Sequence, residues 1–425
     1  MAPRRLASYR SFESFAETSV RPVTETPMPE GANEEPLDPA TEAALRAQLS
    51  DALMRLRAEQ GEVGVMTSVQ DQFASLLQSR LLEDPPDNPQ ILKGVSDPGG
   101  PVEEVKYDER DIFGWLGSLF TWWKKIVPQP WQPPPAQSQQ VGNGERLKVG
   151  LVSDWGTGLY GAPVIAQTMA KMGGLEVAMH LGDVYYSGTM TEAKERFLNV
   201  WPKLPGAVSR TLNGNHEMYT GGEGYFKVML PAFGQSSSCC AIETNHFLLV
   251  GLDSAYVDHD LTADQVPWLE GLVAQAGGRK VILFSHHQPY SLLDSQGPKL
   301  TAKISRLLSD GRIFAWYWGH EHRCVLYDKH PTWRLHGRCI GHGGYPHFRD
   351  KLSNLAAGPG TMWRRLPAAG LVPGALILDA PNPYIKGEEE KYGANGFVTL
   401  ELDGPRAHEV VMAPDGTVLL EHDLQ

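Results

Sequence analysis

The stretch LKVGLVSDWGTG, residues 147–158, begins the regular part of the sequence. Its apolar run, 147–153, has the length and composition of a buried β-strand, and it ends at Asp154 among turn residues. The segment that follows, 161–172, has the pattern of a helix. A single carboxylate in this position is more often a turn residue than a functional group. Its meaning therefore depends on what the other strands supply.

The alternation of strands and helices continues along the chain. Apolar strands are predicted at 175–182, 207–212, 246–253, 280–285 and 312–319, and helices at 262–276 and 299–309. Two alternating segments, 397–404 and 417–424, predict antiparallel strands that close the domain. The pattern indicates an α/β fold, in which ligands bind at the carboxyl ends of the strands.

The first 145 residues differ in composition from the rest. Residues 1–37 are predicted to be a disordered tail, 38–127 a partly helical extension, and 128–145 a proline-rich linker before a domain at 146–425. Within the extension, 111–127 combines aromatic side chains with two lysines. This segment is predicted to form a helix that either lies at a membrane surface or packs on the domain or a second subunit.

Composition bounds the class of protein. The chain has 425 residues, 41% of them hydrophobic, and a formal net charge of −12, which argues against a nucleic-acid-binding surface. The 4 cysteines are too few for a disulfide framework and are predicted to be buried thiols in a reducing compartment. We see no signal peptide and no apolar run of about 18 residues. These features predict a cytoplasmic protein, with peripheral membrane association through 111–127 as an open alternative.

Five strand ends carry side chains of one chemical kind. They are Asp154, the GDVYY segment at 182–186, GNHE at 214–217, the histidine pair at 286–287, and GHEH at 319–322. Oxygen and imidazole donors without thiolates suit Fe, Mn, Zn or Co better than a structural zinc. Each element alone has an ordinary structural explanation. Five of them in order, all at one edge of a predicted sheet, favour a metal site.

This series of motifs resembles that of the calcineurin-like metallophosphoesterases, over roughly residues 147–345. Gly156 and Tyr186 make it most similar to the purple acid phosphatase branch. The resemblance implies an αββα sandwich with mixed sheets and a centre of two metal ions. It implies that the first ion is held by Asp154, Asp183, Tyr186 and His322, and the second by Asp183, Asn215, His287 and His320. Iron would occupy the first position if Tyr186 is a ligand, and Fe, Zn or Mn the second.

Two of these assignments have alternatives. Family members often read H-x-P at the fourth motif, which selects His287 ahead of Pro289. His286 would then face away from the substrate or lie beside it. Tyr185 would exchange roles with Tyr186 if the turn after Asp183 had a different register.

The resemblance implies hydrolysis of phosphate esters. Two cations that share a carboxylate and a water would generate a bridging hydroxide for attack on phosphorus. His216 would lie outside the metal shell, near the phosphate and the leaving group. Glu217 would either orient His216 or only hold the loop. Asp253 is predicted to accept a hydrogen bond from a ligand histidine, and His342 to contact the substrate or its surroundings.

The leading prediction is an acid-phosphatase-like monoesterase that acts on a small phosphorylated substrate. One alternative is a phosphodiesterase acting on cyclic nucleotides or phospholipid headgroups. A remote alternative is a non-catalytic scaffold with the same fold.

Overall fold

The computed structural model describes residues 72, 75, 76, 78, 79, 126–294, 299–349, 352, 355–360 and 362–425. The chain divides into two compact units, residues 1–127 and 128–425. In the first unit the five described residues between 72 and 79 are helical, and Leu76 is buried. The predicted tail at 1–37 and nearly all of the predicted helix at 111–127 lie outside the described residues.

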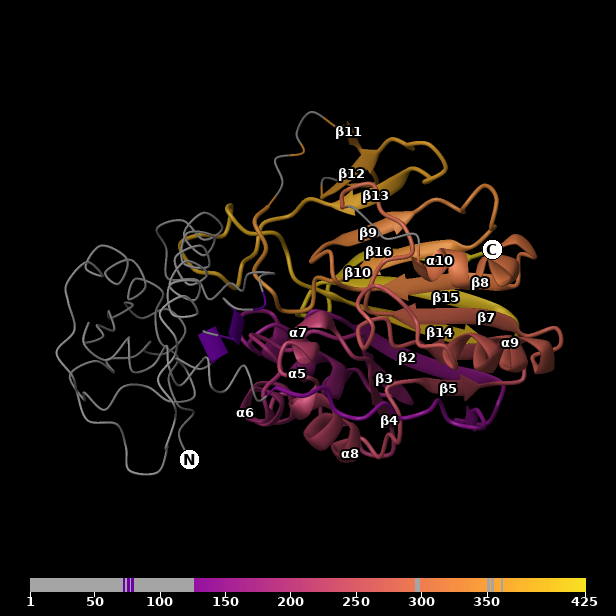
Figure 1. Ribbon diagram of the computed structural model, residues 1–425. Coiled ribbons are helices and arrows are strands. Elements are labelled where there is room, and N and C mark those ends of the chain that lie inside the picture. The colour runs from indigo at the N-terminus through magenta and orange to yellow at the C-terminus, as the bar shows by residue number, and fades with distance from the viewer. Residues whose placement is uncertain are drawn as a thin grey trace, which may run out of the picture. The chain divides into compact units, whose positions relative to one another are not determined.

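Two β-sheets form the second unit (Figure 1). The first has ten strands in the order β1 (Gln139–Gln140), β5 (Cys240–Glu243), β6 (Phe247–Gly251), β7 (Lys280–Ser285), β8 (Ile313–Trp318), β10 (His336–Ile340), β9 (Cys324–Tyr327), β13 (Ala375–Leu378), β12 (Trp363–Leu366) and β11 (Ala356–Ala357). The second has six strands in the order β16 (Val418–Leu424), β15 (Arg406–Met412), β14 (Phe397–Asp403), β2 (Arg146–Val152), β3 (Val177–His180) and β4 (Val208–Thr211).

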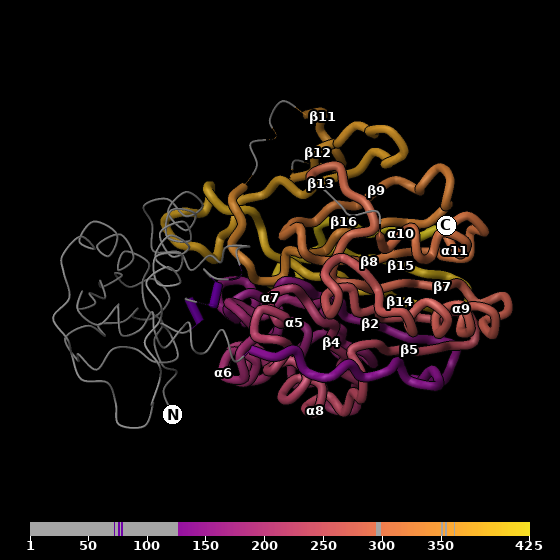
Figure 2. The backbone as a smooth tube through the Cα atoms, viewed as in Figure 1, coloured from indigo at the N-terminus to yellow at the C-terminus, as the bar shows by residue number. Residues whose placement is uncertain are grey.

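Both sheets mix parallel and antiparallel pairs. Strands β2, β3 and β4 are parallel to one another, as are β6, β7, β8 and β10. The last strands of the chain complete the second sheet, because β14 pairs antiparallel with β2 (Figure 2). The predicted closing strands at 397–404 and 417–424 are confirmed.

The side chains of the central strands alternate between two cores. In β7, Ile282 and Phe284 face the core between the sheets, whereas Val281 and Leu283 face the outer side. That outer core is shared with the helices α9 (Gln265–Gln275), α10 (Lys299–Lys303) and α11 (Ser305–Ser309). The six-stranded sheet shares its outer core with α5 (Ala162–Met172), the π-helical turns η2 (Ala193–Leu198) and η3 (Tyr225–Met229), and α8 (Leu230–Ala232). Two short helices, α6 (Met190–Glu192) and α7 (Asn215–Met218), lie in the connections. This arrangement is the expected αββα sandwich.

Two details differ from the predicted organisation. The helix expected at 299–309 is two short helices, because Ile304 leaves the helical conformation at φ −111° and ψ 21°. Residues 128–145, predicted as a linker, are part of the second unit. Their strand β1 pairs with β5, and the indole Nε1 of Trp131 donates to Asp264 Oδ2 at 2.8 Å.

The four cysteines are unpaired and buried, as predicted. Burial raises the pKa of the Cys240 thiol to about 11, so this side chain behaves as a small apolar group. Among the described residues, no helix has the length and apolar character needed to cross a bilayer.

Candidate metal centre

Strand ends from both sheets meet at one place. Asp154 follows β2, Asp183 follows β3, and Asn215 begins α7 after β4. From the ten-stranded sheet, His286 follows β7, and His320 and His322 follow β8. Five of these six side chains form two overlapping groups of possible metal ligands, and the sixth, Asn215, lies within hydrogen-bond distance of two of them.

The first group is Asp154, Asp183 and His322, whose ligand atoms all lie within 4.8 Å of one another. Asp154 Oδ1 is buried, lies 3.5 Å from His322 Nε2, and has no hydrogen-bond partner among the described residues. Its other oxygen, Oδ2, accepts a hydrogen bond from the backbone N–H of His320 at 3.0 Å. Burial raises the pKa of Asp154 to about 8. An unpaired buried carboxylate oxygen is costly unless a cation binds it, so this group fits a metal ion.

The second group is Asp183, His286 and His320, again with ligand atoms within 4.8 Å. Asn215 Oδ1 lies 3.0 Å from both His286 Nε2 and His320 Nδ1. The other ring nitrogen of His286, Nδ1, lies 2.9 Å from the carbonyl of Leu181. When Nδ1–H donates to that carbonyl, the lone pair of Nε2 faces the cluster, which is the usual arrangement of a metal-binding histidine.

Asp183 belongs to both groups and is the carboxylate able to bridge two ions. The negative charge of Asp183 also acts on His286, whose Nε2 lies 3.3 Å from Asp183 Oδ2. Burial alone would lower the pKa of His286, but the charge and hydrogen bond of Asp183, together with the charges of Asp154 and Glu217, raise it to about 9. A cation that binds between Asp183 and His286 must therefore displace a proton from His286.

The structure corrects the choice of tyrosine. The hydroxyl of Tyr185 donates to Asp183 Oδ2 at 3.0 Å and lies 2.7 Å from His322 Nε2. Tyr186, predicted as the ligand, is buried with its ring beside the guanidinium of Arg196 at 5.5 Å. The turn after Asp183 directs the two neighbouring rings to different sides, and motif spacing does not determine its register.

The structure also corrects the choice of histidine. His286 and not His287 lies with Asn215 and Asp183. The side chain of His287 is fully buried and contacts neither of those residues through a hydrogen bond. Its Nδ1 lies 3.1 Å from Ser254 Oγ. The alternation of β7 explains this, because residues 282 and 284 face the core between the sheets and 286 continues that face.

The ligands sit on strained or crowded backbone. Asp154, Asp183, His320 and His322 have φ between 52° and 74°, a region that non-glycine residues rarely adopt. Glycines beside them allow the chain segments to come close. A Cβ on Gly319 would lie 1.9 Å from Ser153 Oγ and 2.4 Å from Asp154 Oδ2, so no other residue fits there without displacing the ligand.

His216 lies beside the cluster and belongs to neither ligand group. Its Nδ1 is 2.6 Å from the carbonyl of Tyr186, and its ring centroid is 4.1 Å from that of Tyr185. Burial lowers the pKa of His216. With Nδ1 bonded to the backbone, Nε2 is the nitrogen left to exchange a proton.

Of the two roles considered for Glu217, its contacts match the one in which it holds a loop. It accepts hydrogen bonds from the backbone N–H groups of Asp183, Val184 and Gly214 at 2.9–3.1 Å. Glu217 thus contacts the loops that carry Asp183 and Asn215. The side chain of His216 bonds instead to the carbonyl of Tyr186. Glu217 therefore positions two ligand loops.

Two further predicted residues are placed away from ligand contacts. Asp253 accepts from the Nδ2 of Asn213 at 3.2 Å and from the backbone of Ala255 and Tyr256, rather than from a ligand histidine. The buried ring of His342 lies against Gly396, and His342 belongs to neither ligand group.

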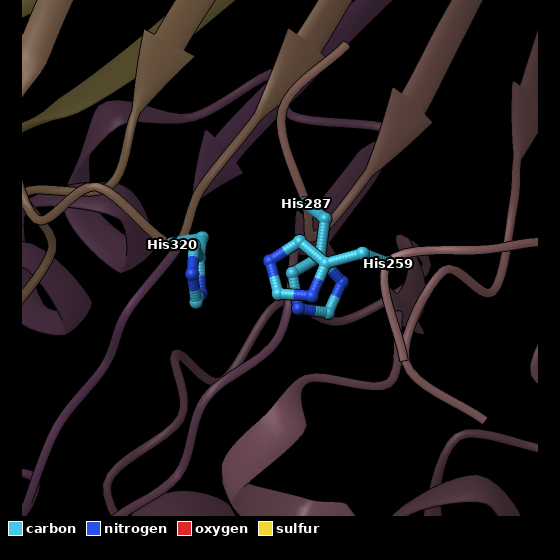
Figure 3. Close-up of side chains that lie close together, drawn as sticks. All are labelled: His259, His287 and His320. Carbon is cyan, nitrogen blue, oxygen red and sulfur yellow. The ribbon is translucent and has the colours of Figure 1, made fainter. Parts of the chain in front are cut away.

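Two residues beside the centre were not identified from the sequence. The ring of Tyr345 packs on His322 with centroids 3.9 Å apart. His259 lies with His287 and His320, with ligand atoms within 4.8 Å (Figure 3). Position was the available signal for His259, because its loop follows β6 at the same edge of the sheet.

Comparisons with known proteins agree with this site. The profile of the calcineurin-like phosphoesterase family matches residues 147–324. The glycerophosphodiester phosphodiesterase GpdQ of Enterobacter lignolyticus is 29% identical over 126 residues, which are 27% of this chain and 44% of that protein. The matched stretch thus spans less than half of that relative.

Among solved structures, the purple acid phosphatase PPD1 of yellow lupin aligns with a TM-score of 0.48 and 15% identity, over 69% of this chain and 55% of that one. A dimetal phosphatase from Danio rerio aligns with a TM-score of 0.40 and 11% identity, over 66% and 98% of the two chains. The matched segment contains the motif residues from Asp154 to His322, and the similarity to the calcineurin-like phosphoesterases lies in this segment.

Proposed function

We propose that this protein hydrolyses phosphate esters with two metal ions held between its sheets. The observation that carries the proposal is the pair of ligand groups joined through Asp183. The first ion would be held by Asp154, Asp183 and His322 with the hydroxyl of Tyr185, and the second by Asp183, Asn215, His286 and His320. Both groups contain only oxygen and nitrogen donors, which suits Fe, Mn or Zn.

The bound ions would supply Lewis acidity, which neutralises charge on the phosphate and acidifies water. The chain's own residues supply orientation and proton transfer. Asp183 is fixed by the backbone N–H of His216 at 3.1 Å and by the hydroxyl of Tyr185. His216 would exchange a proton with the substrate through Nε2, because Nδ1 is committed to the Tyr186 carbonyl.

Phosphomonoesters are the substrate class we place first, on the motif resemblance to purple acid phosphatases. Phosphodiesters are the second candidate, and the similarity of part of the chain to a glycerophosphodiester phosphodiesterase favours them. The two classes differ in the charge and bulk of the group beside the scissile bond. We assign the contact with that group to residues 258–261, in the loop that carries His259.

The test is hydrolysis of p-nitrophenyl phosphate and of bis(p-nitrophenyl) phosphate by the full chain. We expect activity that is lost in chelator and returns with Mn²⁺ or Zn²⁺. The higher kcat/KM of the two substrates assigns the class. A metal-loaded, folded protein that hydrolyses neither ester would refute the proposal.

Two variants separate metal binding from catalysis. His216→Ala should keep both metals and lower kcat by about 10²–10⁴, because it removes only a proton-transfer group. Asn215→Ala should lose metal from the second position. Equal metal loss in both variants would contradict this division of roles.

A further inference from the structure

A third group of imidazoles lies beside the dinuclear centre. His259, His287 and His320 place ligand atoms within 4.8 Å of one another. They come from three segments that are distant in sequence, namely the loop after β6, the end of β7 and the end of β8 (Figure 3). Only His320 also belongs to one of the groups that would hold the two ions.

One ring nitrogen of His287, Nε2, has no hydrogen-bond partner in the described part of the chain. The side chain of His287 is fully buried. The oxygen of Ser254 accepts the backbone N–H of His287 at 3.0 Å and lies 3.1 Å from its Nδ1. When Nδ1–H donates to this oxygen as well, Nε2 presents a bare lone pair.

The surroundings of this nitrogen are other possible ligands. The ring of His259 is 3.8 Å from that of His287, centroid to centroid, and the ring of His320 is 4.7 Å away. The carboxylate of Asp258 reaches the group from the solvent side, with Oδ1 3.8 Å from His287 Nε2 and 2.9 Å from His259 Nδ1. A buried acceptor among imidazoles and one carboxylate is satisfied by a cation.

We propose that His259, His287 and His320 form a third cation site, beside the two family positions. Three imidazole nitrogens with a carboxylate nearby suit Zn²⁺, which histidine triads bind with one position open. Since Nδ1 of His320 faces Asn215 and His286, a cation at the third site would bind Nε2 of the same ring in place of its proton. His259 has a positive φ of 53° and a side chain 29% exposed, so the cation would fix a surface loop to the buried centre.

The test is the zinc stoichiometry of the full chain after removal of metal with chelator. Titration with Zn²⁺, followed by elemental analysis, should give three equivalents for the wild type. His259→Ala and His287→Ala should each give two, because either change removes a ligand of the third site alone. His246→Ala is the matched control, since His246 is a partly exposed histidine paired with Glu145, and it should keep three.

Cobalt gives a second measurement that does not depend on activity. The third equivalent of Co²⁺ should add a visible band of its own, absent in His259→Ala and present in His246→Ala. Circular dichroism checks that each variant is folded, and the exposed position of His259 makes it the safer of the two. Two equivalents in the wild type, or three in His259→Ala, would overturn the proposal. Fewer than two equivalents of Zn²⁺ in His259→Ala would also overturn it, because His259 would then contribute to binding of the two ions of the dinuclear centre.

Discussion

At the scale of single residues, the composition of the candidate metal centre depends on which of two adjacent residues points its side chain toward it. Tyr185 and Tyr186 are identical side chains on adjacent positions, yet only Tyr185 reaches Asp183 and His322. His286 and His287 differ in the same way. The type of residue was predictable at each position, and the neighbour that is used depends on backbone direction.

Iron loading provides a test for the tyrosine. In protein loaded with ferric iron, we expect a visible charge-transfer band from a tyrosinate ligand. Tyr185→Phe should abolish the band, because it removes the hydroxyl beside Asp183. Tyr186→Phe is the matched control and should keep it. A band lost only in Tyr186→Phe would show that the ring exchanges place when metal binds.

At the scale of elements, each ligand depends on where a strand stops and how the next turn is built. The strands β2, β3, β7 and β8 and the side on which ligands gather were predictable, because apolar runs followed by polar residues mark strand ends. The alternation of β7 also predicts that His286 faces the cluster, although the H-x-P spacing suggested His287.

Other features of the site could not be read from the sequence. Strands β9 to β13 lack a strong periodic pattern, and the loops that bring His259 and Tyr345 to the centre have no regular period. Glu217 bonds three backbone N–H groups from two loops, and spacing alone does not show that such loops are adjacent. Tertiary contacts between distant segments decide these positions.

The turn after β8 provides a test of glycine at a ligand loop. In Gly319→Ala the new methyl group would overlap Ser153 Oγ and Asp154 Oδ2, so the first metal position should weaken. We expect at least a tenfold loss of Zn²⁺ affinity by titration calorimetry. The matched control is Gly271→Ala in α9, where a Cβ meets nothing within 4 Å. Equal affinities in the two variants would contradict this account of Gly319.

At the scale of the whole molecule, a buried ion pair joins the two sheets. Arg338 on β10 donates through Nε to both oxygens of Glu409 on β15, at 2.8 Å and 3.0 Å. The hydroxyl of Tyr317 donates to the same carboxylate. Pairs of this kind contribute little net stability when intact, but removing one partner leaves the other as an uncompensated buried charge.

Removing that arginine should therefore destabilise the fold strongly. We expect Arg338→Ala to lower the free energy of unfolding by about 3–5 kcal/mol, measured by urea denaturation. Arg146→Ala breaks an exposed pair with Asp403 and should cost no more than about 1 kcal/mol. A similar loss of unfolding free energy in both variants would show that breaking the buried pair costs no more than breaking an exposed one.

Metal binding should depend on pH, because cations and protons compete for the centre. In the metal-free protein the pKa of Asp154 is raised to about 8 by burial, and that of His286 is about 9 because of Asp183. Both groups must lose a proton before a cation binds, so affinity should rise from pH 6 to pH 8. Each displaced proton contributes about tenfold per pH unit. Calorimetry in buffers of different ionisation enthalpy counts the protons released, and a pH-independent affinity would contradict the proposed ligands.

The ligands are divided between the sheets, with Asp154, Asp183 and Asn215 on one and His286, His320 and His322 on the other. Bound cations would thus be coordinated from both sheets at once, and the residues of one sheet alone would not hold them. Slippage of one layer against the other by a fraction of an ångström would alter the spacing of the ions. Substitutions deep in the interior, remote from any substrate, could then impair turnover while leaving every ligand in place.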